Sequence, residues 1–331
     1  WVISKLLTKG QRIHIKLSDQ IDFRFQFSVL PKFLEQLHQF DMNLGGLMSG
    51  DIVPAEDKKK YLIRSLMEEA IASSQLEGAS TTREIAKEML RNNRQPANIS
   101  EKMIMNNYTT VQKVVELKNE AITKERILDL HAIITNETLG NSMLEGRFRT
   151  TNTINVVDAI TGDVYYMPPD CNRIEQLMEE FCAFANRKED GEFVHPILKG
   201  IILHFLIGYI HPFADGNGRT ARAIFYWYLV SKGYWLVEYM SISKVILDAP
   251  AQYSRAYLHT EYDNNDLTYF LQYNLNCLER AMEGLHEYIK RKIAEKKKMF
   301  TIVSQLDLND RQAEIIGNLL QDARQSLTIK G

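Results

Sequence analysis

The sequence has few cysteines and no long apolar run. Only three cysteines occur among the 331 residues, Cys171, Cys182 and Cys277, and none stands in a C-x-x-C pair. Their odd number and wide spacing disfavour a disulfide framework or a cysteine zinc site and fit a reducing cytoplasm. No apolar run approaches the roughly 20 residues that cross a bilayer, and the opening WVISKLLTKG is too short and polar for a signal peptide. We therefore expect a cytoplasmic protein without a membrane partner.

The chain also lacks an excess of charge of either sign. Forty basic residues stand against forty-two acidic ones, a formal net charge of -2. This balance creates no overall field that would attract nucleic acid, although a local patch still could. With 45% hydrophobic and 25% charged residues, the chain can bury a sizeable core and form two or three domains.

Apolar residues recur at helical spacing along most of the chain, which predicts a mainly α-helical fold. We expect Gly78 to end the first of these helices, and Ser100 and Thr123 to cap the third and fourth at their starts. Before about residue 138, no strand-like alternation is strong enough to assign. The predicted helices cover residues 58–78, 81–93, 99–120, 122–138, 171–188, 195–210, 218–230, 249–262 and 266–300.

One segment interrupts the helical pattern. Residues 146–169, GRFRTTNTINVVDAITGDVYYMPP, are rich in Thr, Val, Ile and Tyr around a turn at 161–163, which predicts a β-hairpin. A lone hairpin is marginally stable in water. It must therefore pack against the helices or serve as a binding element.

The segment 211–222, HPFADGNGRTAR, carries most of the chemistry. His211 follows an apolar helix, and Pro212 prevents that helix from continuing, so the imidazole stands at a break. With an ordinary pKa of about 6.5, a histidine there suits a general base. The next residues combine a carboxylate, Asp215, with a glycine-containing helix start whose amides can bind an anion. Magnesium ions are often held by one carboxylate together with phosphate oxygens.

Two arginines complete this pattern. Arg219 and Arg222 lie three residues apart, hence on one helical face, where they can reach phosphate groups. A glycine turn or a capping histidine alone would be ordinary structure, but their coincidence in twelve residues favours a polyphosphate and metal site with a base. Zinc is disfavoured because no second histidine stands at ligand spacing. A Walker A loop is excluded because the GK[ST] ending and a preceding strand are missing.

HPFADGNGR together with Arg222 resembles the Fic motif, H-P-F-x-D/E-G-N-G-R-x-x-R, of Fic-domain AMP-transferases. Each fixed position is met, and Ala221 stands where many members have glycine. The resemblance spans roughly residues 58–295 and implies a Fic-type helical bundle in which residues 146–169 form a flap over the site. The flap would pair with an extended segment of the target protein.

The resemblance also implies roles for individual residues, with ATP and Mg²⁺ as cofactors and a protein as the target. His211 would deprotonate a Ser, Thr or Tyr hydroxyl that attacks the α-phosphate, and Asp215 would hold Mg²⁺. Phe213 would anchor the loop, and Arg219 would neutralise the β-phosphate. The remaining nucleotide-site residues that it implies are Gly216, Asn217, Gly218, Thr220, Ala221, Arg222 and, on a looser match, Tyr253.

A second motif precedes the first. Ser73, Glu77 and Gly78 resemble the S/T-x-x-x-E-G/N motif of the inhibitory helix of many Fic proteins, here in residues 58–78. Glu77 could pair with Arg222 and take the place of the γ-phosphate, so that ATP would bind without its α-phosphate aligned. An exposed glutamate before a helix-ending glycine is the ordinary alternative.

We divide the chain into an N-terminal segment (1–57), a Fic region (58–295) and the start of a helical module (296–331). The last resembles the opening of a winged helix, with Asn309 capping a helix over 310–320; DNA binding would need the rest of that module. We expect His131 and His204 to be structural, whereas His195, like His204, fits family positions around the preceding helix. A homodimer is expected from the relatives. The alternatives are AMP removal, another phosphoryl or nucleotidyl transfer at the same site, and a nucleotide-sensing transcriptional regulator with little turnover.

Overall fold

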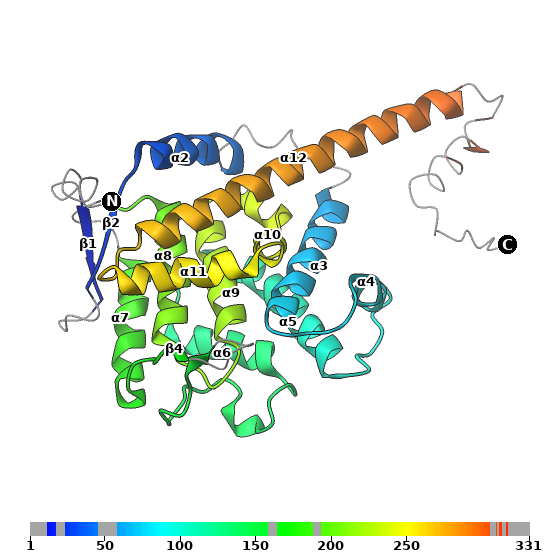
Figure 1. Ribbon diagram of the computed structural model, residues 1–331. Helices are drawn as coiled ribbons and strands as arrows, with labels where there is room; N and C mark the ends of the chain where they lie inside the picture. Colours follow the sequence, from blue (N-terminus) through cyan, green and yellow to red (C-terminus); the bar gives the residue numbers. More distant parts are fainter. Residues whose placement is uncertain are drawn as a thin grey trace. The chain divides into compact units, whose positions relative to one another are not determined.

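The computed structural model describes residues 12–17, 24–45, 58–157, 164–187 and 193–304, together with positions 309, 311, 312 and 316. The chain divides into two compact units, Trp1–Ala281 and Met282–Gly331. Most of the described residues are helical and the only described strands form two short antiparallel pairs, which confirms the mainly α fold (Figure 1).

The elements of the first unit follow one another along the chain with short connections. Its first half contains β1 (Arg12–Lys16), β2 (Arg24–Ser28), α2 (Pro31–Leu44), α3 (Lys58–Leu76), α4 (Arg83–Arg91), α5 (Ile99–Glu116) and α6 (Lys124–Thr135). Its second half contains β3 (Val156–Val157), β4 (Val164–Tyr166), α7 (Ile174–Asn186), α8 (Pro196–Ile210), α9 (Asn217–Ser231), α10 (Ile242–Leu247), α11 (Pro250–Tyr262) and the beginning of α12 (Thr268–Ser304).

The helix ends test the capping predictions. Thr123 caps α6, since its hydroxyl accepts from the Arg126 N–H. Gly78 follows the last residue of α3 with φ 91°, as expected of a glycine that ends a helix. Ser100 was wrong as the cap of α5. The cap is Asn98, whose side chain accepts from the Glu101 N–H, and a longer N-terminal extension of the helix places Ser100 inside its first turn.

The N-terminal segment contains elements that the sequence analysis did not assign. β1 and β2 pair antiparallel, with Ile13 opposite Phe27 and Ile15 opposite Phe25. Apolar residues do alternate along both strands, but each is only five residues long, so the pattern was judged too weak. The absence of strands before residue 138 was therefore a wrong expectation.

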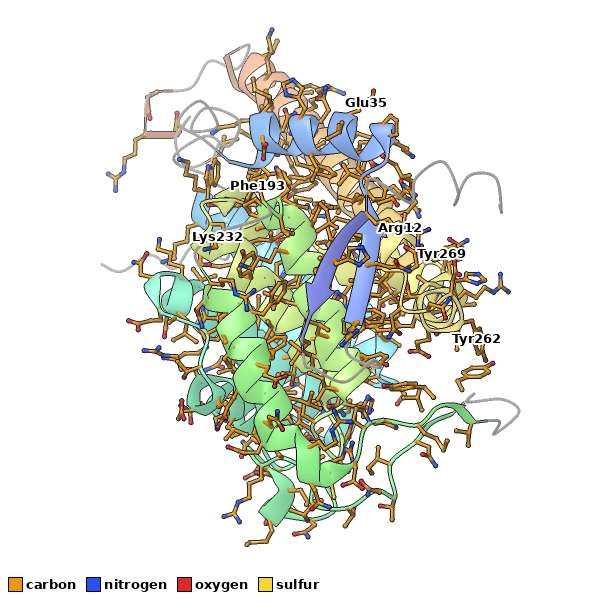
Figure 2. The ribbon with its side chains drawn as sticks, turned by 90° about the vertical axis from the view of Figure 1, so that its left-hand side faces the viewer. Arg12, Glu35, Phe193, Lys232, Tyr262 and Tyr269 are labelled. Carbon is orange, nitrogen blue, oxygen red and sulfur yellow. The ribbon has the colours of Figure 1, made fainter. Side chains whose placement is uncertain are left out.

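This hairpin covers one face of α8 (Figure 2). Phe25 meets Phe205 and Tyr209 of α8 edge to face, with ring centroids 5.9 Å and 5.2 Å apart. On its other side, Gln26 exchanges backbone hydrogen bonds with Asn265 and Leu267, at 3.2 Å and 2.8 Å. The hairpin thus extends the apolar core beyond the helices and shields α8 from solvent.

Helices α8 and α9 form the centre of the first unit. Every residue of α8 from Ile197 to Ile207 is buried, as expected of a helix that is apolar on all sides. α9 packs along α8 and also contacts α5 and α6, while α3 packs against α5 and α10. The loop between α8 and α9 is therefore held at both ends by buried helices.

The second predicted hairpin is confirmed in its stem. Val156 of β3 pairs with Tyr166 of β4, and Val157 pairs with Val164. The Tyr166 hydroxyl donates to the Tyr209 carbonyl, 2.9 Å away, which ties β4 to α8 near the loop. The predicted turn at 161–163 lies outside the described residues.

The second unit is described mainly through the C-terminal part of α12. Asn309 and Gln312 exchange two hydrogen bonds between side chain and backbone N–H, at 2.9 Å and 3.1 Å, as the predicted cap requires. Most of the helix predicted at 310–320 lies outside the described residues, so the winged-helix resemblance stays a prediction. No described helix combines the length and the apolar character that a membrane span needs.

Candidate active site

His211 forms the junction between α8 and the loop. Its backbone is left-handed, with φ 49° and ψ 57°, and its N–H donates to the Ile207 carbonyl at 2.9 Å. In the ring, Nδ1 lies 3.2 Å from the Gly208 carbonyl oxygen. Because that oxygen can only accept, Nδ1 carries the hydrogen and Nε2 keeps a free lone pair. Burial lowers the pKa of His211, so the imidazole is neutral at physiological pH and can accept a proton.

The side chain of Asn217 closes the loop. Its Oδ1 accepts from the Phe213 N–H and its Nδ2 donates to the Phe213 carbonyl, both at 2.9 Å. Asn217 is 3% exposed, and Phe213 is fully buried. Asn217 therefore fixes the loop through its side chain, and only its backbone N–H remains a candidate for anion binding.

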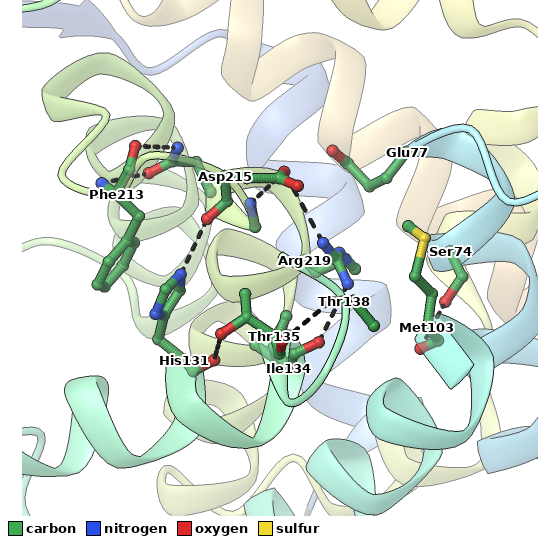
Figure 3. A network of polar contacts seen from close by, with 12 residues as sticks. Ser74, Glu77, Met103, His131, Ile134, Thr135, Thr138, Phe213, Asp215 and Arg219 are labelled. Atoms are coloured by element: carbon green, nitrogen blue, oxygen red, sulfur yellow. Dashed lines mark hydrogen bonds and ion pairs between the residues drawn. The ribbon is translucent and has the colours of Figure 1, made fainter. Parts of the chain in front are cut away.

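His131 of α6 supports the same loop from below (Figure 3). Its ring stacks on Phe213 with centroids 3.7 Å apart. Nδ1 accepts from the Gly146 N–H at 3.0 Å, and Nε2 lies 2.9 Å from the Asp215 carbonyl oxygen. Both nitrogens are thus used only in the neutral ring, and burial lowers the pKa of His131 to about 4. The structural role expected for His131 is confirmed.

The two glycines allow the loop to turn and the start of α9 to be approached closely. Gly216 has φ 82°, a left-handed conformation that glycine adopts without strain. At Gly218, an added Cβ would lie only 2.2 Å from Oε1 of Glu77. The Glu77 carboxylate therefore rests on the first turn of α9, where the amide groups and the helix dipole favour negative charge.

Glu77 also forms an ion pair with Arg222. The Glu77 Oε1 and the Arg222 Nη2 are 2.8 Å apart, although the two residues are separated by 145 positions in the sequence. Arg222 additionally donates from Nε to the Ser73 hydroxyl at 2.8 Å and from Nη2 to the Ser73 carbonyl at 3.0 Å. Since Arg222 and Ser73 are almost fully buried, the structure brings together all three members of the second motif and the last arginine of the first.

Arg219 and Asp215 form the other side of the loop (Figure 3). Arg219 is 1% exposed and donates from Nη1 to the Ile134 carbonyl at 3.1 Å. Its Nη2 lies 3.8 Å from Oδ1 of Asp215, whose side chain is 57% exposed. The buried guanidinium and the exposed carboxylate thus face one another across the edge of the loop.

Three expected nucleotide-site residues lie less close to the loop surface. Thr220 and Ala221 are fully buried in α9, and the Thr220 N–H donates to the Gly216 carbonyl at 2.9 Å, so neither presents a group at the surface of the loop. The Tyr253 hydroxyl of α11 lies 2.7 Å from Nε2 of His204. Burial lowers the pKa of His204 to about 3, which confirms a core histidine.

The residue that the sequence analysis missed is Arg149, which lies two positions after Arg147 in GRFRT. Arg149 is 3% exposed. Its guanidinium donates to carbonyl groups at both ends of the flap and to the carbonyl of His211, 2.9 Å away. A second arginine in a segment that otherwise reads as a strand was the available signal, since a charge there is buried only when it is fully hydrogen-bonded.

The comparisons with known proteins agree with this geometry. Residues 121–229 match the model of the Fic/DOC family, a segment that includes the loop and most of the helices around it. A relative from Nematostella vectensis, named protein adenylyltransferase Fic, is 28% identical over 167 residues, or 50% of this chain and 35% of that protein. A relative of the same name from Aedes aegypti is 27% identical over 172 residues, 50% of this chain and 30% of that one. This chain spans about a third of the length of these relatives.

Solved structures share the fold. A Fic family protein from Desulfovibrio desulfuricans matches with a TM-score of 0.60 and 17% identity, over 89% of this chain and 88% of the other. A Fic domain containing signaling protein from Bacteroides thetaiotaomicron matches with a TM-score of 0.62 and 22% identity, over 78% and 96% of the two chains. At these identities the likeness concerns the arrangement of the helices.

Proposed function

Since this chain carries a domain of the Fic/DOC family, we propose that it is a protein adenylyltransferase that moves AMP from ATP to a Ser, Thr or Tyr hydroxyl of a protein. The observation that carries the proposal is the neutral His211, with Nε2 unoccupied, at the mouth of the glycine loop that begins α9. The two relatives named as protein adenylyltransferases support the reaction type and ATP as the donor.

The proposed step is an in-line substitution at the α-phosphate. His211 Nε2 takes the proton of the target hydroxyl, and the hydroxyl oxygen forms a bond to the α-phosphorus. The bond from that phosphorus to the bridging oxygen of the β-phosphate breaks, and pyrophosphate leaves. Most of the catalysis in such a transfer comes from positioning and from stabilising negative charge. The backbone amides of residues 216–218 and the guanidinium of Arg219 supply that stabilisation.

Asp215 is suited to hold a magnesium ion together with ATP. Its side chain is more than half exposed, and no described group of three or more His, Cys, Asp or Glu residues could hold a metal by protein ligands alone. Magnesium commonly uses one or two carboxylates and completes its shell with phosphate oxygens and water. When bound, the ion would neutralise phosphate charge, while Asp215 would orient the phosphates relative to His211.

Glu77 is proposed to restrain the reaction. Its carboxylate occupies the first turn of α9 and neutralises Arg222, so it uses the anion-binding groups that a terminal phosphate of ATP would use. ATP could then bind only in a pose that places its α-phosphate away from His211. The protein would be slow in its resting state and faster when Glu77 is displaced.

The flap is proposed to bind the target. Val164 and Met167 are 53% and 74% exposed on its second strand and the residues after it, which suits the addition of an extended target segment along β4. The chemistry of that segment would determine which hydroxyl reaches His211.

Mass spectrometry of Glu77→Gly protein incubated with Mg-ATP tests the proposed function. The added group on the protein, or on proteins of a lysate from the same source, should be AMP, and the His211→Ala variant in the same background should add none. An added phosphate would point to kinase chemistry. No addition by either protein, together with salt-sensitive DNA binding, would favour a nucleotide-sensing regulator.

A further inference from the structure

Arg149 lies where three segments of the chain meet. Its Nε donates to the His211 carbonyl at 2.9 Å, and its Nη1 donates to the Thr151 carbonyl at 2.9 Å. Its Nη2 donates to the Pro169 carbonyl. The backbone N–H of Arg149 donates in addition to the carbonyl of Pro212, 2.9 Å away. One residue thus contacts the catalytic loop and both ends of the flap.

The contacts to the loop matter because His211 has an uncommon backbone conformation. A left-handed conformation costs a residue other than glycine on the order of 1 kcal/mol and persists only where the surroundings impose it. The carbonyl groups of His211 and Pro212 are both held by Arg149. These two bonds fix the peptide plane that follows His211, and with it the direction in which the imidazole leaves the backbone.

The contacts to the flap are strengthened by Asn152. Its Oδ1 accepts from Nη1 of Arg149 at 3.2 Å and from the Cys171 N–H at 2.7 Å, and its Nδ2 donates to Asp170 at 2.9 Å. The two ends of the flap are therefore joined to each other through Asn152 and joined to His211 through Arg149.

We propose that Arg149 is a positioning residue that couples the base of the flap to His211, so that the flap and the imidazole hold one common orientation. Arg149 is buried below the loop and acts through His211. The inference rests on the proposed function, because the reaction it serves is AMP transfer. A target segment that binds the flap then binds to the element that also aligns the base.

Arg149 also influences His211 through its charge. Burial is the main cause of the lowered pKa of His211, and the nearby guanidinium lowers it further. The carboxylates of Glu77 and Asp215 act in the opposite direction. Geometry and charge can therefore be separated by two substitutions, since lysine keeps the charge without the planar set of donors and glutamine loses the charge.

The test uses the full chain in the Glu77→Gly background, with Arg149→Lys, Arg149→Gln and, as a matched control, Arg147→Gln at an exposed arginine two residues away. Both Arg149 variants should lower kcat by about 10- to 100-fold, the usual effect of misplacing a catalytic group, with the KM for Mg-ATP changed by about twofold at most. The acid limb of the kcat–pH profile should stay in place for Arg149→Lys and move to higher pH for Arg149→Gln. Arg147→Gln should change neither.

Amide hydrogen exchange supplies a readout that does not depend on AMP transfer. Exchange should become faster at residues 208–211 and at 170–172 in both Arg149 variants and remain unchanged in Arg147→Gln. Unchanged exchange in both segments, or an unchanged kcat in an active background, would overturn the inference. Should Glu77→Gly itself transfer no AMP, the proposed function fails and exchange alone decides the coupling. Should Arg149→Gln not fold, Arg149→Lys decides by the same two measurements.

Discussion

Replacing Glu77 with glycine is expected to accelerate AMP transfer. Glu77 lies just after the last residue of α3, so a glycine there does not weaken the interior of a helix. The substitution removes the carboxylate that rests on Gly218 and pairs with Arg222 at 2.8 Å. It leaves the bonds between Arg222 and Ser73 in place. The anion-binding groups at the start of α9 then become available to a phosphate of ATP.

The contact between Glu77 and Arg222 sets the size of the effect. A hydrogen bond to a charged group contributes about 1.5–3 kcal/mol, and the pair is largely buried, with side chains 25% and 3% exposed. If the productive pose of ATP requires this bond to break, its removal lowers the barrier by that amount. Since about 1.4 kcal/mol corresponds to a tenfold change in rate, we expect an increase of about 10- to 150-fold.

The assay is the initial rate of AMP incorporation, followed by mass spectrometry with Mg-ATP in excess. Glu77→Gln keeps the shape of the side chain without its charge and should give an intermediate rate. Glu88→Gln, at an exposed glutamate on α4, is the matched control and should not change the rate. Rates within about twofold of the unmodified protein for both Glu77 variants would refute the reasoning, because that contact would then be no part of the barrier.

Three further results are expected. Glu77→Gly should lower the melting temperature without nucleotide, because Arg222 loses its buried counter-charge, and Mg-ATP should raise the melting temperature more in this variant than in the unmodified protein; an equal rise in both would contradict the shared site. Burial lowers the pKa of His131 to about 4 and of His204 to about 3, so the unfolded chain binds protons first, and the free energy of unfolding should fall as the pH drops from about 6.5 to about 4. Urea unfolding at several pH values measures this slope, which His131→Gln should reduce and which would be flat if both rings were charged in the folded protein. Asn217→Ala removes both side-chain bonds to Phe213 and should destabilise the protein by about 1–3 kcal/mol, as denaturant titration can show; a smaller loss would mean that the stacking of Phe213 on His131 suffices to hold the loop.

Much of this protein follows from local sequence patterns. The helices α3 to α9, α11 and α12 were predicted because an amphipathic or fully apolar helix repeats its pattern over three or more turns. The loop chemistry was predicted because a proline, two glycines and the polar residues between them stand within twelve positions. The strands β1 and β2 were missed because five residues carry too little periodicity to outweigh the helical surroundings.

The sequence by itself determined which side chains carry the chemistry, namely a histidine at a helix break, one carboxylate, a glycine helix start and an inhibitory glutamate. Only the tertiary structure decided what these groups contact. Glu77 and Arg222 meet across 145 positions because α3 and α9 pack in the same unit. The partners of Arg149 are backbone carbonyl groups, and every residue has one, so no sequence pattern can distinguish the carbonyls that a buried arginine will bind.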